Sequence, residues 1–423
     1  MRPSLAVLGT VLWLPPCLGC PPEAPPPPEP VDATPDDAPW PHDPGAVWPV
    51  GCFVEVTASH PSQPWLALAC TNAEANMGAV LVVDLDSGTL RSSTLIEDYV
   101  GWPATDVLRW HPDGELLATN VGTNGIAVLA NGEVLGMAFP DETRDHPVAF
   151  VWVGDHVFTD TGAYFRIEEG QEPRFEFDEL PGPRFQTLAW SETLGAVVGR
   201  VGGGGLAAYD PRREVTLWTQ DFAQHPQGST DCRRDGRRCV RRLFGSLGAP
   251  DALIFVDGDA GTLLERRSAA GPNIGHLRWG PDGLLVTSHR HVVGGPSEDR
   301  SVEAFRDGVS AWSTPLGARV VRASGVADAS GTTWSPDGTG VALLLDRQEV
   351  QLLDGRDGAL GIRFLALAKP IPEGLPDWYT PQSALPGAVM WPTADRIVRI
   401  APHFLTIYDT GGVKVGELTM PAR

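Results

Sequence analysis

The sequence is poor in positive charge and has no long block of like charges. Lys and Arg total 32 against 53 Asp and Glu, which gives a formal net charge of −21, and only two lysines occur, Lys369 and Lys414. Nonspecific binding of a nucleic-acid backbone is therefore not expected. A sustained helical period is also missing, while 48 glycines and 40 prolines supply many turns. This composition argues against a coiled coil or a helical bundle, and 42% apolar residues are enough to bury a core.

Long hydrophobic runs are absent except near the start of the chain. Residues 5–14 form an apolar run that is too short to span a bilayer and has the length of a signal-peptide core. The Leu-Gly-Cys sequence at 18–20 resembles the lipobox of bacterial lipoproteins, although Cys17 stands where that family prefers Leu. The resemblance implies a signal peptide over residues 1–19 and a lipid on Cys20. The alternative is an ordinary secretory signal, with Cys20 merely the first thiol of the mature chain.

Residues 20–45 are predicted to form an unfolded tether. Between Pro21 and Gly45 there are eleven prolines, six acidic residues and no Lys or Arg, so the segment buries little apolar surface and favours polyproline II. At about 3.1 Å per residue it would hold a domain up to roughly 75 Å from its anchor. Trp40 falls inside this tether, so its replacement is expected to leave folding unaffected. Pro21 replaces the Asp that marks inner-membrane retention in many Gram-negative lipoproteins, and by that resemblance the outer membrane is the expected destination.

Four further cysteines lie beyond the signal and the anchor: Cys52, Cys70, Cys232 and Cys239. In an exported chain, an even number of cysteines in near pairs predicts two local disulfides, Cys52–Cys70 and Cys232–Cys239. The first would join adjacent strands, with a nominal stabilisation of roughly 3 kcal/mol from loop closure. A zinc site is the alternative, and it is disfavoured because no CxxC spacing exists.

From residue 46 onward one pattern recurs: a short apolar strand that ends in an aromatic residue, a turn, and three more strands. The clearest copies span residues 107–120, 276–289 and 332–345, and weaker copies are anchored at Trp152, Trp190, Phe244 and Trp391. A first copy at residues 55–70 keeps the spacing but lacks the aromatic. Anchor spacings of 35 to 57 residues suit four-stranded propeller blades with variable loops. Eight units are counted, and seven blades remain compatible if one weak unit is an insertion.

The turn residues support this repeat. Pro-Asp-Gly occurs at 112–114, 281–283 and 336–338, where proline presets φ at the second turn position and glycine accepts a positive φ. Each of these turns is expected to reverse the chain between the first two strands of a unit. Third strands that run into a second turn are predicted at residues 80–88, 350–358 and 405–412.

The sequences WHPDG, WGPDG and WSPDG, with Asp-Gly turns of the DLDSG kind downstream, resemble the WD40-like propeller repeat of the TolB type. The resemblance implies an all-β fold, with one exported β-propeller over residues 46–423. It implies no reaction, because propellers serve both binding and catalysis on one scaffold.

No enzyme signature is found, and no cofactor is predicted. His289 and His291 could ligate a metal, but a polar hairpin end is the expected structure. Asp257–Gly261 resembles the start of a calcium loop without its third acidic position and distal Glu, so a hairpin turn is expected. Gly202–Gly205 lacks a following Lys and is expected at a hairpin tip, not around a phosphate. The sequence at 244–248 has Phe where a nucleophile elbow needs its first glycine.

Two insertions look more like binding elements. The first, residues 232–242, could present a contact surface to phosphate, carboxylate or lipid headgroups if its disulfide holds like charges together. Its arginines are Arg233, Arg234, Arg237, Arg238, Arg241 and Arg242. A solvated loop is the alternative. The second, residues 368–387, holds five prolines and the pair Trp378 and Tyr379, which would be contact anchors on a propeller face or would fill a gap between blades.

Together these features predict a monomeric, lipid-anchored β-propeller of the cell envelope. It would bind an envelope protein or a small molecule on one face, without nucleic acid and without catalysis of its own. The rival interpretation is a metal-dependent hydrolase or lactonase with a site in the central channel. Within the repeat, Trp334 is expected to be buried between neighbouring blades, since it ends the first strand of the clearest unit.

Overall fold

The computed structural model describes Trp40 and most of residues 42–421. The described stretches are 42–72, 77–96, 107–122, 125–139, 149–168, 173–177, 182–222, 230–233, 235–243, 252–268, 273–289, 300–318, 320–321, 331–346, 348–367 and 387–421. All of them belong to one compact unit, residues 39–423.

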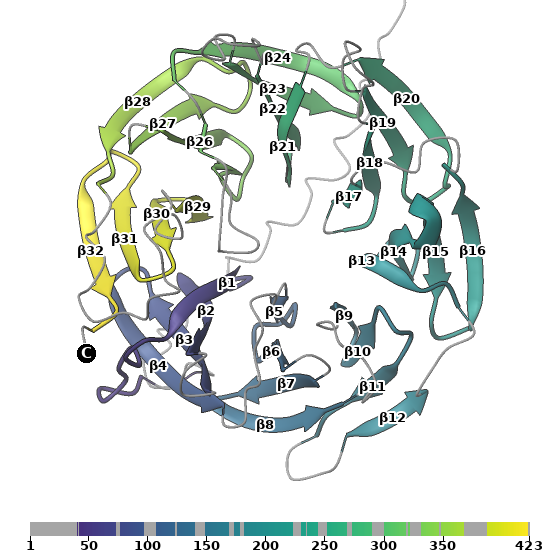
Figure 1. The fold of residues 1–423 in the computed structure, drawn as a ribbon, viewed down its shortest axis with the longest axis horizontal. Helices are drawn as coiled ribbons and strands as arrows, with labels where there is room; N and C mark the ends of the chain where they lie inside the picture. The colour runs from purple at the N-terminus through teal and green to yellow at the C-terminus, as the bar shows by residue number, and fades with distance from the viewer. Residues whose placement is uncertain are drawn as a thin grey trace, which may run out of the picture. The chain divides into compact units, whose positions relative to one another are not determined.

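Eight antiparallel sheets of four strands each follow one another along the chain and form a ring (Figure 1). Blade 1 contains β1 (Phe53–Ser59), β2 (Trp65–Asn72), β3 (Met77–Asp84) and β4 (Thr89–Ile96), and blade 2 contains β5 (Leu108–Trp110), β6 (Leu116–Val121), β7 (Gly125–Ala130) and β8 (Glu133–Ala138). Blade 3 contains β9 (Phe150–Val153), β10 (His156–Thr159), β11 (Tyr164–Arg166) and β12 (Arg174–Phe177). Blade 4 contains β13 (Phe185–Ser191), β14 (Ala196–Val201), β15 (Leu206–Asp210) and β16 (Val215–Gln220).

Blade 5 contains β17 (Thr230–Cys232), β18 (Arg238–Leu243), β19 (Ala252–Asp257) and β20 (Leu263–Ser268), and blade 6 contains β21 (Asn273–Gly280), β22 (Gly283–His289), β23 (Arg300–Arg306) and β24 (Val309–Leu316). Blade 7 contains β25 (Thr332–Trp334), β26 (Gly340–Leu345), β27 (Glu349–Asp354) and β28 (Leu360–Leu365). Blade 8 contains β29 (Ala388–Thr393), β30 (Arg396–Ala401), β31 (Phe404–Asp409) and β32 (Lys414–Thr419). The predicted all-β propeller is confirmed, and the blade count is eight.

Within a blade, the second and third strands are the most buried and the outer strand is the most exposed. In every blade the first strand lies innermost and the fourth forms the outer rim (Figure 1). The second strands β2 and β26 are buried at every position, because neighbouring blades cover both of their faces. The rim strand β28 is exposed at nearly every position. Runs of Val, Ile, Leu and Ala in the second and third strands therefore form the core between blades.

The ring closes by packing and without exchange of a strand. Each sheet contains four consecutive strands, so blade 8 meets blade 1 face to face. Leu405 and Ile407 of β31 share a buried cluster with Leu66 of β2. At the edge of this junction, the Val54 N–H donates to the Pro402 carbonyl at 2.8 Å.

The tight turn between the first and second strands has one geometry in several blades. In blade 2, Gly114 has φ +84° and donates its N–H to the carbonyl of His111. In blade 7, Gly338 has φ +74° and donates to Ser335 in the same way. The Pro-Asp-Gly turns thus reverse the chain between first and second strands, as predicted. The predicted third strands are also confirmed, as β3, β27 and β31.

The tryptophan that ends a first strand reaches back to the preceding blade. Its indole N–H donates to a first-strand carbonyl there, and these bonds run from Trp110 to Ala58, from Trp152 to Arg109 and from Trp279 to Asp231. Trp334 is 5% exposed and packs against blade 6, where a Cβ added to Gly280 would lie 1.9 Å from its ring. The prediction that Trp334 is buried between neighbouring blades is confirmed.

Blade 5 departs from the predicted register. The expected anchor was Phe244, whereas the first hairpin of this blade is formed by β17 and β18. Cys232 faces Cys239 across it, as Trp110 faces Leu117 in blade 2. The arginine-rich segment is therefore the innermost hairpin of a blade, and its interpretation as an insertion is wrong. The sequence hides this register because cysteine stands in place of the aromatic and Arg234 in place of the turn proline.

The strap, Trp40 and residues 42–52, lies against blade 1. Trp40 is fully buried: its ring meets Trp110 edge-on at 5.1 Å between centroids, and its indole N–H donates to the Glu115 carbonyl at 3.3 Å. Arg91 of β4 donates its Nε–H to the Trp40 carbonyl, and its own carbonyl accepts the Asp43 N–H. The expectation that Trp40 belongs to an unfolded tether is wrong, because the seam between blades 1 and 2 buries its indole.

Candidate functional site

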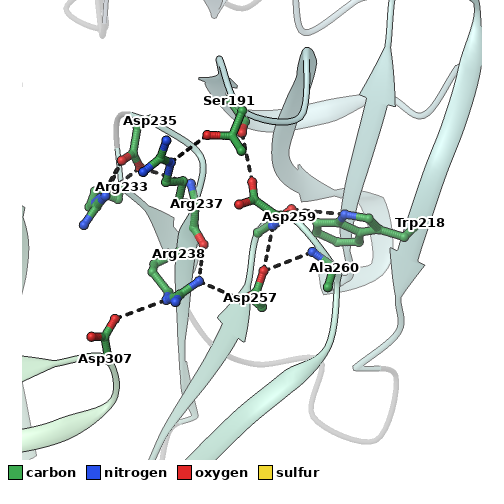
Figure 2. A network of polar contacts seen from close by, with 12 residues as sticks. Ser191, Trp218, Arg233, Asp235, Arg237, Arg238, Asp257, Asp259, Ala260 and Asp307 are labelled. Carbon is green, nitrogen blue, oxygen red and sulfur yellow. Dashed lines mark hydrogen bonds and ion pairs between the residues drawn. The ribbon is translucent and has the colours of Figure 1, made fainter.

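The two sides of the ring differ in their connections. Successive strands run in opposite directions, so the turns that join strands 1–2 and 3–4 of each blade lie on one side, which we call the turn face. The remaining connections lie on the other side, the loop face. The turn face carries a cluster of charged side chains from blades 4, 5 and 6 (Figure 2). This cluster contains three of the six arginines singled out in the sequence, Arg233, Arg237 and Arg238.

The arginine turn, residues 232–239, joins β17 to β18 and is closed by a disulfide. Cys232 and Cys239 are partners across the hairpin, with Cα atoms 4.0 Å apart. The other disulfide joins Cys52, directly before β1, to Cys70 of β2 in blade 1. Both predicted pairings are confirmed. Each closes a short loop and so restricts the unfolded chain.

Arg233 forms a forked ion pair with Asp235 inside the turn. Its Nε lies 2.8 and 2.9 Å from the two carboxylate oxygens, and Nη2 contacts the same group. Asp235 also accepts the Arg237 N–H at 3.0 Å. The hydrogen bond to Asp235 raises the pKa of Arg233. Burial alone would raise the pKa of Asp235, but the bonds from Arg233 and Arg237 outweigh it and lower that pKa. Both groups therefore stay charged and hold the turn in one shape.

Arg238 connects the arginine turn to two outer turns. Its Nη1 lies 2.8 Å from Oδ2 of Asp257, which ends the third strand of the same blade. Its Nε lies 3.6 Å from Oδ1 of Asp307, in the outer turn of blade 6. Figure 2 shows this guanidinium between the two carboxylates. Arg238 thus links blade 5 to blade 6.

Contacts on the other side of the turn reach blade 4. The Nε–H of Arg237 donates to Oγ1 of Thr193 at 2.7 Å. Ser191, at the end of β13, donates its hydroxyl to Oδ1 of Asp259 at 3.2 Å (Figure 2). The arginine turn and the outer turn of its blade therefore bind to the blades on both sides.

Arg241 is absent from this surface, and its assignment to an exposed arginine cluster is wrong. It is 0% exposed in β18, a second strand that neighbouring blades cover on both faces. Its guanidinium donates to the Gly204 carbonyl and lies 5.1 Å from the ring centre of Phe222. A Cβ on Gly204 would come within 2.7 Å of the guanidinium, so the glycine run makes room for this side chain. Burial lowers the pKa of Arg241.

The described turn-face cluster contains charges of both signs, with one more aspartate than arginine. Three arginines at this surface (Arg233, Arg237 and Arg238) face four aspartates (Asp235, Asp257, Asp259 and Asp307). Arg242 is half-buried in β18. The surface therefore has fixed charges of both signs, and this favours a partner with a complementary charge pattern over a bare anion.

Two further candidate sites are ordinary turns. In Asp257–Gly261, Oδ1 of Asp257 accepts the N–H groups of Asp259 and Ala260 at 2.9 and 3.0 Å, as a hairpin turn requires. Gly202–Gly204 is a single 3₁₀ turn between β14 and β15. In the described part of the chain, no group of three or more His, Cys, Asp or Glu residues is placed to hold a metal ion. Nor does any helix among the described residues have the length and hydrophobicity to cross a membrane.

Several predicted site residues lie outside the described residues. They are Cys20, Arg234, His291, Trp378, Tyr379 and residues 244–248. His289 ends β22.

Sequence reasoning missed the polar and aromatic seam between blades 1 and 2. Besides Trp40 and Trp110, it contains His60, whose ring centroid lies 4.6 Å from that of Trp110. Arg91 is 8% exposed and stacks over Trp65 at 4.2 Å. One feature of the sequence could have predicted this seam. Trp40 is a single large apolar residue in a proline-rich acidic segment, where an unfolded chain would expose it to water.

Comparisons with known proteins agree with the fold. The chain matches no protein-family model and no curated protein. Among solved structures, it resembles the C-terminal WD40 domain of Sif2, with a TM-score of 0.51 and 11% identity over 89% of this chain and 99% of that one. The computationally designed Ika8 protein also has a TM-score of 0.51 and 11% identity, over 87% of this chain and 97% of that one. Such low identities define the class, a β-propeller, and nothing finer.

Proposed function

We propose that this protein is an exported, lipid-anchored β-propeller of the cell envelope that binds a partner protein as a monomeric scaffold. The arginine turn carries the proposal. Its guanidinium and carboxylate groups are held by one another, by a disulfide and by turns from three blades. Groups fixed in advance lose little freedom when they pair with another protein, and an alternation of charge gives specificity for one partner.

The anchor is supported by the lipobox-like sequence that ends at Cys20 and by the proline-rich tether that follows it. Two disulfides fit an oxidising compartment outside the cytoplasm. We expect Cys20→Ala to move the protein from the membrane to the soluble fraction and to abolish incorporation of labelled fatty acid. A wild-type protein that fractionates as soluble and carries no label would overturn the anchor.

The binding site is tested by removal of two charges from the turn. Native envelope extracts are passed over immobilised wild type, an Arg237→Gln/Arg238→Gln variant, and an Arg356→Gln control on the turn face of blade 7. The double variant should lose a partner that the wild type and the control retain, and higher salt should weaken the wild-type complex. Its melting temperature should fall only slightly, because Arg237 is exposed and the ion pairs of the half-buried Arg238 contribute about 1 kcal/mol. An identical set of captured proteins for all three would remove the arginine turn as the site.

A further inference from the structure

Large apolar side chains are unevenly exposed around the ring. Of fifteen such residues in the described part of the chain, nine lie on blades 7, 8 and 1 and on the strap. Six of the nine form what we call the apolar rim: Leu360, Ile362, Leu365, Leu367, Val413 and Val415. The remaining six residues lie on blades 2, 4, 5 and 6. Blades 7, 8 and 1 are neighbours, so the apolar exposure occupies one continuous sector of the rim (the left side of Figure 1).

Rim strands differ in how far they are covered. Leu360 and Ile362 of β28 are 61% and 49% exposed, and Leu365 and Leu367, at and just beyond its end, are 61% and 63% exposed. In β4 of blade 1, by contrast, Arg91 and Ser92 are buried, and Arg91 is held by the strap. Blade 7 has no such cover among the described residues. Apolar side chains gathered in this way on a soluble surface mark a contact with another apolar phase or molecule.

The attachment point of the tether, in the seam between blades 1 and 2, borders this sector. Trp40 is fixed to blade 1 through Arg91, and the strap exposes Val47 at 65% and Val50 at 42%. If the proposed tether is extended, the distance from Cys20 to Trp40 would be roughly 60 Å at about 3.1 Å per residue. A lipid on Cys20 would therefore keep the propeller near the membrane, at a distance that lets the sector of blades 7, 8 and 1 reach its surface.

We propose that the apolar rim contacts the lipid bilayer, so that the propeller stands edge-on to the membrane. This inference rests on the proposed lipid anchor. Leucine, isoleucine and valine side chains enter the boundary between headgroups and acyl chains, where their transfer from water is favourable. Arg363 and Lys414 are sequence neighbours of rim residues and form ion pairs with Glu349 and Glu417. Their long side chains can keep these charges at the polar level. An edge-on propeller leaves both the turn face and the loop face open to partners.

The test uses the full chain with Cys20→Ala, so that no lipid is attached to it. This protein is floated with vesicles made of equal parts phosphatidylethanolamine and phosphatidylglycerol. We expect it to bind reversibly at high lipid concentration, too weakly to remain on membranes that are isolated and washed, as in the fractionation above. We expect Leu360→Ser/Ile362→Ser to reduce its partition about tenfold, because two apolar side chains are lost from the contact. The matched control is Leu263→Ser/Leu264→Ser on the blade 5 rim strand, whose side chains are 56% and 42% exposed. The control should bind like its parent, at low and at high salt.

The possible outcomes distinguish a failure of the membrane contact from a failure of the lipid anchor. No flotation of the Cys20→Ala chain, or an equal loss in both serine variants, would overturn the membrane contact even if wild type is fully lipidated. Sedimentation that reveals a dimer, abolished by Leu360→Ser/Ile362→Ser alone, would assign the rim to a second copy instead. If labelling shows no lipid on Cys20 while the unlipidated chain still floats through the rim, the anchor fails and the membrane contact stands. Melting temperatures of both variants must match that of the parent.

Discussion

The seam between blades 1 and 2 and the seam between blades 6 and 7 are filled by tryptophan from different sources. In the 6–7 seam the blades supply both indoles: Trp334 ends a first strand, and Trp312 of β24 donates to the Gly355 carbonyl at 2.8 Å. In the 1–2 seam, Ser92 of β4 holds the position of Trp312, four residues beyond the turn glycine. Trp40 reaches this seam from outside the repeat. A segment outside the repeat can therefore supply part of the packing between two blades.

The largest effect should follow from opening the 6–7 seam. Trp334→Ala removes a side chain that is 5% exposed and leaves a cavity between two blades. We expect the free energy of unfolding to fall by about 3–5 kcal/mol, measured by urea denaturation. Phe139→Ala, at a position 49% exposed, is the control and should change little. Equal, small losses at both positions would contradict the packing of this seam.

A smaller loss should follow from opening the 1–2 seam. Trp40→Ala should lower the free energy of unfolding by about 2 kcal/mol, less than Trp334→Ala, because the strap can detach without unfolding a whole blade. Amide exchange at Asp43, whose N–H bonds to Arg91, should rise at the same time. Val47→Ala in the same strap serves as the control, since Val47 is 65% exposed. Wild-type stability in Trp40→Ala would mean that the seam does not need its indole.

The 1–2 seam should also be sensitive to acid. His60 is 6% exposed; its Nδ1 accepts the N–H groups of Ser62 and Gln63, and its Nε2 lies 3.2 Å from the Gly114 carbonyl. Burial lowers the pKa of His60 from its ordinary value of 6.5, against the opposing effects of Gly114 and Asp113.

Because the unfolded chain then binds a proton more readily, the contribution of His60 to stability is complete above pH 6.5. It is lost as the pH falls from that value through the folded pKa. Thermal unfolding of wild type and His60→Gln, followed from neutral pH to about pH 5, measures the difference. Parallel curves for the two proteins would show that His60 keeps its ordinary pKa.

The smallest effect concerns the seam that closes the ring. Arg396 of blade 8 lies 3.0 Å from the Asp86 carboxylate of blade 1 and donates to the Leu85 carbonyl at 3.3 Å. Arg396→Gln should cost about 0.2–1 kcal/mol, and added salt should shrink the difference. A loss comparable to that of Trp334→Ala would mean that charge, rather than apolar packing, closes the ring.

The fold could be predicted because each blade carries several signals at once. Turn proline and glycine, a strand-ending aromatic and apolar second and third strands agree in most units, so eight units could be counted. The register of blade 5 was predicted wrongly because Cys232 replaces the strand-ending aromatic residue and Arg234 replaces the turn proline. The burial of Arg241 depends on that register, since only its place in a second strand puts it between blades. The docking of Trp40 depends on a slot built by residues some 50 to 75 positions away, which composition alone does not reveal.

Because no strand is shared across a blade junction, the integrity of the sheets does not depend on the blade at which the chain begins. Trp48 of the strap and Met420 after the last strand belong to the same buried cluster, so the two ends of the propeller lie close together. A short linker could join them, and the chain could begin between any two other blades with every sheet intact. The same property would let such a ring evolve by duplicating or deleting whole blades, one sheet at a time.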